Sequence, residues 1–357
     1  MQVRDVRNFN VLFIIYKYIE TVHHIQAWAA CFKIIKRLSW NKMEPHAIYD
    51  FAVAWNWEYD REFIQLVQEV FRLNNLTVLE IHTENVEKIF HYLKKGELQF
   101  RYFLDRASDE DETFHPLARY VLKQFRSGVG TSIRPINLYD LQIRAADKAT
   151  MHLEFLAHHI DVPYTIIISP YNHRQEVELT ITELAKLGRP FIVKPANTTG
   201  GGIGVVMGAE TLKEIIDARQ SNKNDKYLLQ ETIKPIECAG RRAWFRVFYA
   251  FGDIIPVWWD DVTHIYSILS EDEERQLDVE RLNKITECIH TVCQLDFFST
   301  EVVYTADSRW VTVDYVNEMC DMRLKSRFVD GVPDIIVKRI VYRMMEHVKQ
   351  NGEHQII

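Results

Sequence analysis

A lysine and a dense run of glycines occur together near the middle of the chain. The stretch FIVKPANTTGGGIGVVMG, residues 191–208, places Lys194 after three apolar residues. Its glycines are Gly200, Gly201, Gly202 and Gly204. Backbone N–H groups of such a loop can approach phosphate oxygens closely, and the lysine adds a compact positive charge. The stretch therefore indicates either a phosphate-binding hairpin or a plain hairpin tip.

Neither of the common phosphate motifs is present in this stretch. No Gly-Lys-Ser/Thr sequence follows, as a Walker loop requires. A strand-like run comes directly after the glycines, whereas the dinucleotide-binding turn leads into a helix. The setting of the stretch in the chain must therefore decide between the two interpretations.

Two charged residues lie inside segments that otherwise have the composition of apolar strands. Arg246 lies in AWFRVFYAF, residues 243–251, and Glu301 lies in FFSTEVVYT, residues 297–305. Charged side chains are rarely buried unless they are paired, because leaving water is costly. We therefore expect an anionic partner for Arg246, and we expect Glu301 to belong to a site.

Strand-like and helical segments alternate in the first half of the chain. The expected strands are 47–55, 76–82 and 98–107, and the expected helices are 60–75 and 84–96. Alternation of this kind is typical of a parallel sheet covered by helices. The sequence therefore predicts a small parallel α/β domain over residues 43–136.

From residue 137 the pattern changes to a mixture of helices and longer strand pairs. The expected helices are 138–160, 180–188, 209–219, 277–294 and 330–352. The expected strands are 161–169, 191–195, 226–233, 243–259, 297–305 and 309–317. Thr180 and Gly188 are typical helix-capping residues at the two ends of the second helix. The fold class predicted for the whole chain is α/β with α+β lobes.

The order of these pieces resembles the ATP-grasp superfamily over about residues 137–348. DKATMHLEFLAHHIDVPYT, residues 147–165, is similar to the opening helix, in which a lysine reaches the nucleotide. LGRPFIVKPANTTGGGIGV, residues 187–205, is similar to the strand with the phosphate-binding lysine and its glycine lid. KYLLQETI, residues 226–233, is similar to the strand that holds adenine.

The resemblance implies a set of nucleotide-binding residues and a division of the chain. The implied ATP-binding residues are Lys148, Lys194, Gly200, Gly201, Gly202, Gly204, Gln230, Glu231, Thr232 and Ile233, and the implied catalytic residues are Lys194 and Arg246. From the sequence pattern we expect residues 1–42 to form a helical N-terminal extension and residues 43–136 to form a small α/β domain that precedes the ATP-grasp domain, 137–357. Within the ATP-grasp domain, we expect a nucleotide-clamping lobe over about 160–236 and a lobe for metal and substrate over about 237–350.

The last two strands of the resemblance carry the metal ligands, here Glu301, Asp314 and Asn317. Carboxylate and amide oxygens suit Mg²⁺, or Mn²⁺ in its place. One position departs from the family pattern, because the usual carboxylate two residues before the asparagine is Tyr315. In a regular strand Asp314 and Asn317 point to opposite faces. Either a β-bulge brings them together, or Asn317 acts with Glu318 or Asp321.

The basic residues Arg323, Lys325 and Arg327 follow the metal strand. They could meet an anionic acceptor or form a solvated face.

Composition limits the classes of partner. The chain has 357 residues, 26% of them charged, and a net charge of −7, which does not favour nucleic acid or an anionic membrane. Its five cysteines are widely spaced and have no CxxC pair, which predicts free thiols in a reducing, cytoplasmic compartment. Residues 8–38 are apolar but interrupted by charges, so we expect an amphipathic helix and no membrane span. A homodimer is possible.

The resemblance implies an ATP- and Mg²⁺-dependent ligase that joins a carboxylate to an amine through an acyl phosphate. Its substrates would be small carboxylates and amines of the amino-acid or peptide type. Two alternatives remain. One is a kinase of the same fold that phosphorylates a hydroxyl, and the other is an ATP-binding module without turnover, which the unusual spacing at Tyr315 would explain.

Overall fold

The computed structural model describes residues 47–128, 133–197 and 202–353, with side chains described to residue 350. The predicted extension over 1–42, Gly200 and Gly201 lie outside the described residues. The chain divides into two compact units, residues 1–47 with 93–99 and residues 48–92 with 100–357. The described part of the first unit holds the end of helix α4 and the start of strand β3. The second unit holds the elements discussed below.

A four-stranded sheet of order β2-β1-β3-β4 forms the first part of the chain. Strands β1 and β2 pair in parallel, as do β3 and β4, which confirms the parallel α/β prediction. The strands are β1 (Ala47–Trp55), β2 (Val78–Ile81), β3 (Leu98–Arg106) and β4 (Arg134–Ile136). The helices are α3 (Arg61–Leu73), α4 (Val86–Lys95) and α5 (His115–Ser127), with 3₁₀ turns at Glu58–Asp60 and Glu112–Phe114. Strand β4 and helix α5 were not predicted from the sequence.

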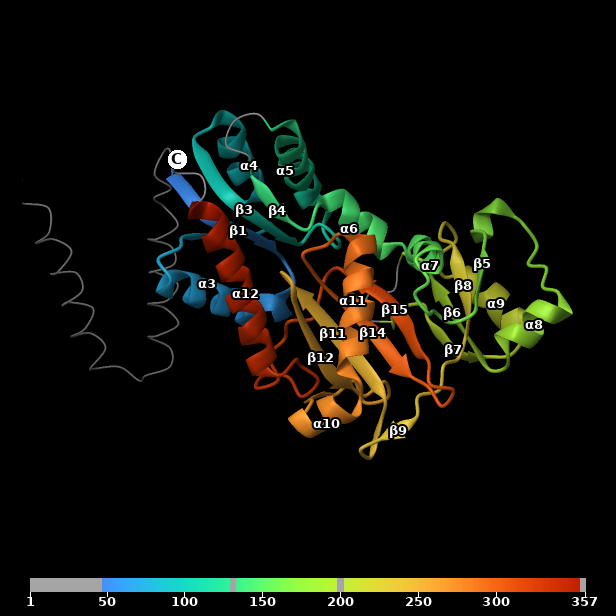
Figure 1. Cartoon of the computed structure of the whole chain (residues 1–357). Helices are drawn as coiled ribbons and strands as arrows, with labels where there is room; N and C mark the ends of the chain where they lie inside the picture. Colours follow the sequence, from blue (N-terminus) through green and yellow to red (C-terminus); the bar gives the residue numbers. More distant parts are fainter. Residues whose placement is uncertain (1–46, 129–132, 198–201, 354–357) are drawn as a thin grey trace, which may run out of the picture. The chain divides into compact units, whose positions relative to one another are not determined.

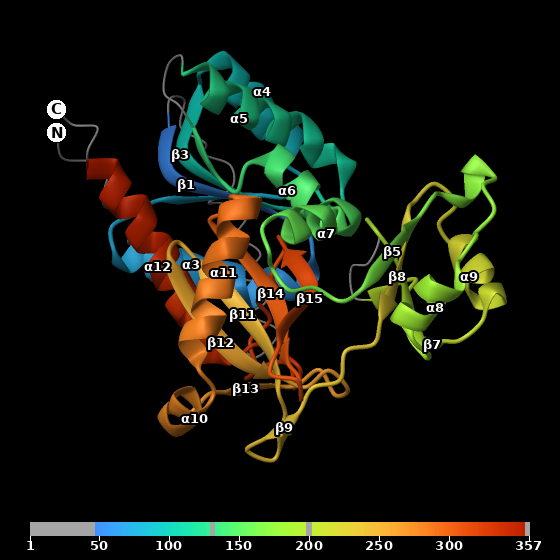
Figure 2. The same cartoon turned by 45° about the vertical axis from the view of Figure 1, so that its right-hand side comes forward.

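A second, antiparallel sheet has the order β5-β8-β6-β7. Its strands are β5 (Thr165–Ile168), β6 (Phe191–Pro195), β7 (Val206–Ala209) and β8 (Tyr227–Glu231). Its helices are α8 (Ile181–Leu187) and α9 (Leu212–Arg219), with a 3₁₀ turn at Tyr171–His173. Both helices begin with a capping box, Thr180 with Glu183 and Thr211 with Glu214. Strands β6 and β7 pair on either side of the glycine run, which confirms the predicted hairpin (Figure 1). Figure 2 shows β5, β8 and β7 of this sheet together with α8 and α9.

A third, antiparallel sheet has the order β13-β12-β11-β14-β15. Its strands are β11 (Trp244–Ala250), β12 (Asp253–Trp259), β13 (Tyr266–Ile268), β14 (Phe297–Tyr304) and β15 (Trp310–Asn317). Beside it lie α10 (Glu271–Gln276), α11 (Val279–Cys293), α12 (Asp334–Glu353) and the short pair β9 (Glu237–Cys238) and β10 (Arg241–Arg242). Helix α11 packs on β11, β12 and β15, and α12 packs against α3 and β11 (Figure 1).

The prediction of one long helix over 138–160 is wrong, because the helix is interrupted at Asp147. Helix α6 (Tyr139–Ala146) ends there, and α7 (Lys148–Ala157) begins at the next residue. Asp147 has extended backbone angles, and its carboxylate accepts hydrogen bonds from the N–H groups of Ala149 and Thr150. It is thus the N-cap of α7. The cap places Lys148 at the first position of a helix rather than in the middle of one.

One helix start and one additional helix also differ from the prediction. Residue 209, expected to begin a helix, ends strand β7, and α9 starts at Leu212 after its capping threonine. Helix α10 was not expected.

No helix in residues 47–128, 133–197 and 202–353 is long and apolar enough to cross a membrane. Four cysteines in these ranges, Cys238, Cys288, Cys293 and Cys320, are free thiols, as predicted.

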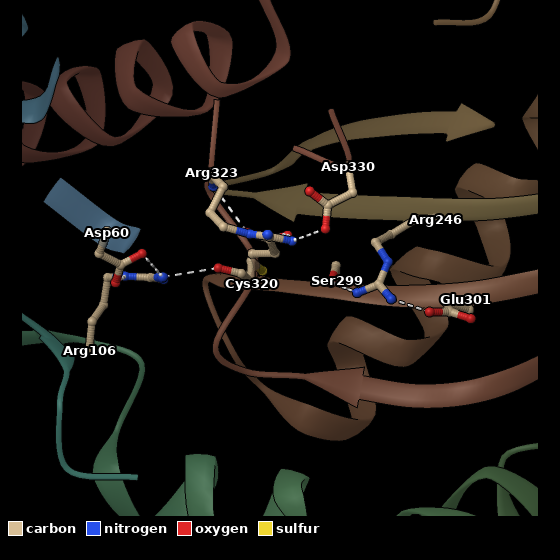
Figure 3. A network of polar contacts seen from close by, with 9 residues as sticks. Asp60, Arg106, Arg246, Ser299, Glu301, Cys320, Arg323 and Asp330 are labelled. Atoms are coloured by element: carbon tan, nitrogen blue, oxygen red, sulfur yellow. Dashed lines mark hydrogen bonds and ion pairs between the residues drawn. The ribbon is translucent and has the colours of Figure 1, made fainter. Parts of the chain in front are cut away.

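A buried ion pair connects the parallel sheet to the chain that follows β15 (Figure 3). Arg106, at the end of β3, donates two hydrogen bonds of 2.7 Å to the carboxylate of Asp60 and one of 3.0 Å to the carbonyl oxygen of Cys320. Arg106 is 6% exposed and Asp60 is 1% exposed. Such a pair fixes relative position more than it adds stability, since both groups lost their hydration on burial.

We expect Arg106→Met to lower the free energy of unfolding by about 3–5 kcal/mol, because it leaves the Asp60 carboxylate buried without a cation. The double variant Asp60→Leu with Arg106→Met should recover most of that loss. Arg126→Met, which breaks an exposed ion pair with Asp140, is the matched control and should cost less than about 1 kcal/mol. Urea unfolding measures all three. A double variant no more stable than Arg106→Met would mean that the unpaired carboxylate is not the source of the loss.

Candidate active site

Strand β15 contains the β-bulge that the sequence left open. Asn317 pairs with Ser299, and Asp314 pairs with Glu301, so three steps along β15 match two steps along β14. The extra residue returns Asp314 and Asn317 to the same face. The Asn317 amide donates a 2.9 Å hydrogen bond to Asp314 Oδ2. The bulge alternative is therefore confirmed.

Glu301 lies directly opposite Arg246 on the neighbouring strand β11. Its two carboxylate oxygens have different partners, since Arg246 Nη2 forms an ion pair with Oε1 and Trp244 Nε1 donates to Oε2 at 2.9 Å. The predicted anionic partner of Arg246 is thus Glu301 (Figure 3). Arg246 also lies 3.5 Å from Ser299 Oγ, and its guanidinium carbon lies 4.8 Å from the ring centre of Trp259.

Two lysines reach strand β15 from other elements. Lys148 Nζ lies 3.9 Å from Asp314 Oδ1, and its backbone N–H donates to the Ala196 carbonyl oxygen at 3.0 Å. Lys194, on β6, is 7% exposed and donates from Nζ to the Val313 carbonyl oxygen at 3.2 Å. The structure thus brings together six of the predicted site residues: Lys148, Lys194, Arg246, Glu301, Asp314 and Asn317.

The pKa values of this cluster are set by burial and by neighbouring charges. Burial lowers the pKa of Lys194 from 10.5 to about 8, and Lys148 adds to this while Asp314 opposes it. Burial alone would raise the pKa of Asp314, but Lys148, Lys194 and Arg246 together lower it. Burial, aided by Asp314, raises the pKa of Glu301. Asp314 is therefore the carboxylate most firmly held in its charged form.

The residues expected around adenine are divided between two environments. Ile233 is 8% exposed and packs with Val303, Val311 and Val313, an apolar cluster next to the charged groups. Gln230, 1% exposed, donates to Thr165 Oγ1 and to the hydroxyl of Tyr315.

The other two residues expected around adenine, Glu231 and Thr232, form hydrogen bonds with backbone groups next to strands of the second sheet. Glu231 accepts from the Tyr164 N–H at 2.8 Å, and Thr232 donates to the Pro190 carbonyl oxygen at 2.9 Å. The described end of the glycine run adopts left-handed backbone angles, with φ +77° at Gly202 and +78° at Gly204. A residue with a Cβ would be strained at both positions, which explains why glycine stands there.

Sequence reasoning missed three side chains of this region. Trp244 could have been found, because it lies two residues before Arg246 and therefore on the same strand face. Tyr315 was noted only as a departure from the family pattern, although it is fully buried. His152, on α7, lies 2.8 Å from the Tyr315 hydroxyl, and burial followed by Lys194 lowers its pKa to about 4. No pattern in the sequence indicated His152.

The basic run after β15 has a structural role for two of its residues. Arg323 pairs with Asp321 at 2.8 Å and with Asp330 at 2.9 Å, and Lys325 donates to the Tyr266 carbonyl oxygen. Arg327 is exposed. Asp321 is thus engaged by Arg323, so the alternative in which it acts with Asn317 is not favoured.

Glu301, Asp314 and Asn317 fit a Mg²⁺ ion that also binds phosphate. They offer two carboxylates and an amide oxygen, which are hard ligands of the kind Mg²⁺ takes when substrate phosphates and waters complete its shell. Among the described residues there is no group of three or more histidine, cysteine or acidic side chains that could hold a metal by themselves.

Neither a protein-family model nor a curated protein sequence matches this chain. Solved structures do. A RimK-domain ATP-grasp protein from Sphaerobacter thermophilus is 19% identical, with 82% of this chain and 98% of that chain covered and a TM-score of 0.56. D-alanine–D-alanine ligase from Bacillus anthracis in complex with ATP is 14% identical, with 86% and 99% covered and a TM-score of 0.57.

This chain has the ATP-grasp fold. D-cycloserine synthetase, 13% identical with 85% and 100% of the two chains covered and a TM-score of 0.53, is a further neighbour of the same shape. At these identities the likeness concerns the fold. The predicted ATP-grasp resemblance and fold class are confirmed.

We expect Lys194→Met to raise the free energy of unfolding of the nucleotide-free protein at pH 7. The lowering of the Lys194 pKa from 10.5 to about 8 means that folding disfavours its ammonium form by on the order of 3 kcal/mol, taken as an upper bound. This cost is fully present below about pH 8 and disappears as the pH rises toward 10.5. The gain in stability should therefore shrink between pH 7 and pH values near 10.

Urea unfolding at the two pH values measures the effect. Lys213→Met, at a side chain that is 85% exposed, is the control and should change stability little at either pH. A Lys194→Met protein that is less stable than the wild type at pH 7 would mean that the bond to the Val313 carbonyl oxygen outweighs the cost of burying the charge.

Proposed function

We propose that this chain is an ATP- and Mg²⁺-dependent ligase that activates a carboxylate as an acyl phosphate for attack by an amine. The observation that carries the proposal is the convergence of Asp314 and Asn317 beside Glu301 through the bulge in β15. Lys148, Lys194 and Arg246 surround the same point.

The reaction has two transfers. A carboxylate oxygen of the first substrate attacks the γ-phosphorus of ATP, the bond from that phosphorus to the bridging oxygen breaks, and ADP leaves. The amine nitrogen of the second substrate then attacks the acyl carbon, the carbon–oxygen bond to phosphate breaks, and the nitrogen gives up a proton. No covalent bond to the protein is needed, so the chain acts by positioning and by stabilising charge.

The charged side chains divide this work. Lys148 and Lys194 bind and neutralise phosphate oxygens, and the apolar cluster beside Ile233 takes the base. Glu301, Asp314 and Asn317 would hold a Mg²⁺ ion, which would supply further positive charge at the terminal phosphates. The described glycines of the run, Gly202 and Gly204, offer backbone N–H groups to the phosphates close to Lys194.

Arg246 has hydrogen-bonding capacity that the protein does not use. Its Nε is buried and has no hydrogen-bond partner in the part of the chain that the structure describes. Burial opposes its charge, but Tyr266, Glu301 and Asp314 more than offset this and raise the pKa of Arg246. A permanently charged group with a spare donor is suited to the transferred phosphoryl group or to the substrate carboxylate.

The names of the structural neighbours support this class of reaction. They include D-alanine–D-alanine ligase, a D-Ala:D-Ser ligase from Enterococcus faecalis, and a macrocyclase bound to its precursor peptide. Each is a protein that this chain resembles in fold. We propose substrates of the amino-acid or peptide type on this ground. Location in the cytoplasm and a homodimer remain predictions.

We expect ADP release from Mg·ATP to depend on an added carboxylate, drawn from a panel of amino acids and dipeptides. Hydroxylamine should trap the activated acyl group as a hydroxamate, which mass spectrometry detects. Asp314→Asn should lower kcat about a hundredfold or more, because it removes the charged carboxylate that would hold the metal at the phosphates. Asp307→Asn, at an exposed aspartate in the turn between β14 and β15, is the matched control and should keep full activity.

Three other outcomes are informative. A stable phosphorylated product with no hydroxamate would support the kinase alternative. Binding of ATP without ADP release for any carboxylate or hydroxyl acceptor would support a module without turnover. Absence of ATP binding would contradict all ATP-dependent functions of the chain.

A further inference from the structure

Tyr315 occupies the position at which the family pattern has a carboxylate, and it contacts three elements at once. Its side chain is fully buried on β15, one residue after Asp314. Its hydroxyl lies 2.9 Å from Gln230 Nε2 on β8 and 2.8 Å from His152 Nδ1 on α7. The ammonium of Lys194, on β6, lies 5.3 Å from the centre of its ring. Tyr315 therefore joins the second sheet, the opening helix and the metal strand.

The hydroxyl of Tyr315 is hydrogen-bonded to two side chains. The Gln230 amide donates to the hydroxyl oxygen, and His152 Nδ1 accepts the hydroxyl hydrogen in the tautomer that carries its proton on Nε2. The same amide also donates to Thr165 Oγ1 at 3.1 Å, so Gln230 is held from two sides. A phenylalanine would fill the space of the ring but would leave Gln230 and His152 each without one partner.

The ammonium of Lys194 depends on β15 for its contacts. It donates to the carbonyl oxygen of Val313 and lies over the ring of Tyr315, two residues further along the same strand. A cation over an aromatic ring is attracted to its face, and more strongly when both are buried. The strand that carries Asp314 and Asn317 thus also places the lysine expected to bind phosphate.

We propose that Tyr315 is a positioning residue that holds the Lys194 ammonium and the Gln230 amide in register with Asp314 and Asn317. The purpose of this arrangement rests on the proposed function. It would present the nucleotide-binding side chains and the metal-binding side chains to the same Mg·ATP. Without the ring, the hydrogen bond to the Val313 carbonyl oxygen would be the contact that remains between the Lys194 ammonium and the backbone of this strand. We expect that bond alone to hold the flexible side chain less firmly. The aromatic ring acts on Lys194, and the hydroxyl acts on Gln230.

The first arm of the test needs no nucleotide. The full-length protein is labelled with ¹³C at lysine Cε, and the Lys194 signal is assigned by its loss in Lys194→Arg. We expect the Lys194 Cε protons to be shifted upfield by the Tyr315 ring in wild type and in Tyr315→Phe. In Tyr315→Leu they should return to the range of exposed lysines. A wild-type signal already in that range, or one unchanged in Tyr315→Leu, would overturn the proposal.

The second arm measures ATP affinity by competition with a fluorescent nucleotide. Tyr315→Leu should weaken binding about tenfold, and Tyr315→Phe should weaken it less, because the ring remains. In a Lys194→Met background, Tyr315→Leu should cause no more than about a twofold further loss, since the ring then has no ammonium to hold. Equal losses from Tyr315→Leu in both backgrounds would overturn the coupling and indicate general damage to the fold.

Tyr227→Phe is the matched control for loss of a buried tyrosine hydroxyl. Tyr227 is fully buried on β8, and its hydroxyl accepts a hydrogen bond from the Asn222 N–H at 3.1 Å. We expect this variant to leave both the Lys194 signal and ATP affinity unchanged. If wild type shows the upfield Lys194 signal but does not bind ATP, the proposed function fails while the contact between Tyr315 and Lys194 stands.

Discussion

The candidate site depends on a local irregularity in strand β15, where the pairing with β14 shifts register on both sides of the Glu301–Asp314 pair. Side chains alternate along a strand, so groups three residues apart point to opposite faces unless the alternation is broken. The bulge between Asp314 and Asn317 breaks it and turns both side chains toward Glu301. Tyr315, which lies between these two residues on β15, contacts Gln230 and His152. The proposed metal ligands and the residue proposed to position Lys194 thus lie in the same short part of one strand.

The charged side chains around this feature are held together at a cost in folding stability, with one more cation than carboxylate. Three cations, Lys148, Lys194 and Arg246, face two carboxylates, Glu301 and Asp314. Burial lowers the pKa of Lys194 and raises that of Glu301, so both ions are held where the free protein disfavours them. An anionic ligand with its metal would relieve this imbalance. Sites that store unfavourable charge in this way are typically functional rather than structural.

Much of this arrangement could be predicted from the sequence, and the remainder depended on backbone geometry. Lys194, the glycine hairpin and the pairing of Arg246 followed from residue types inside apolar strands. The break at Asp147 was not predicted, because apolar residues continue at helical spacing on both sides, although aspartate is a favoured N-cap residue. The bulge could only be stated as an alternative, since the three-residue spacing of Asp314 and Asn317 indicates a bulge only if both are known to act together. Contacts between distant segments, such as Tyr315 with His152, left no pattern.

Binding of Mn²⁺ in place of Mg²⁺, followed by electron paramagnetic resonance, tests the central claim most directly. In the presence of a non-hydrolysable ATP analogue, the wild type should bind Mn²⁺ with one tight site. Glu301→Gln and Asp314→Asn should each weaken it at least tenfold, while Asp307→Asn should not. Equal Mn²⁺ affinity in wild type and Asp314→Asn would mean that the bulge in β15 does not build a metal site, and would contradict the proposed metal-dependent ligase.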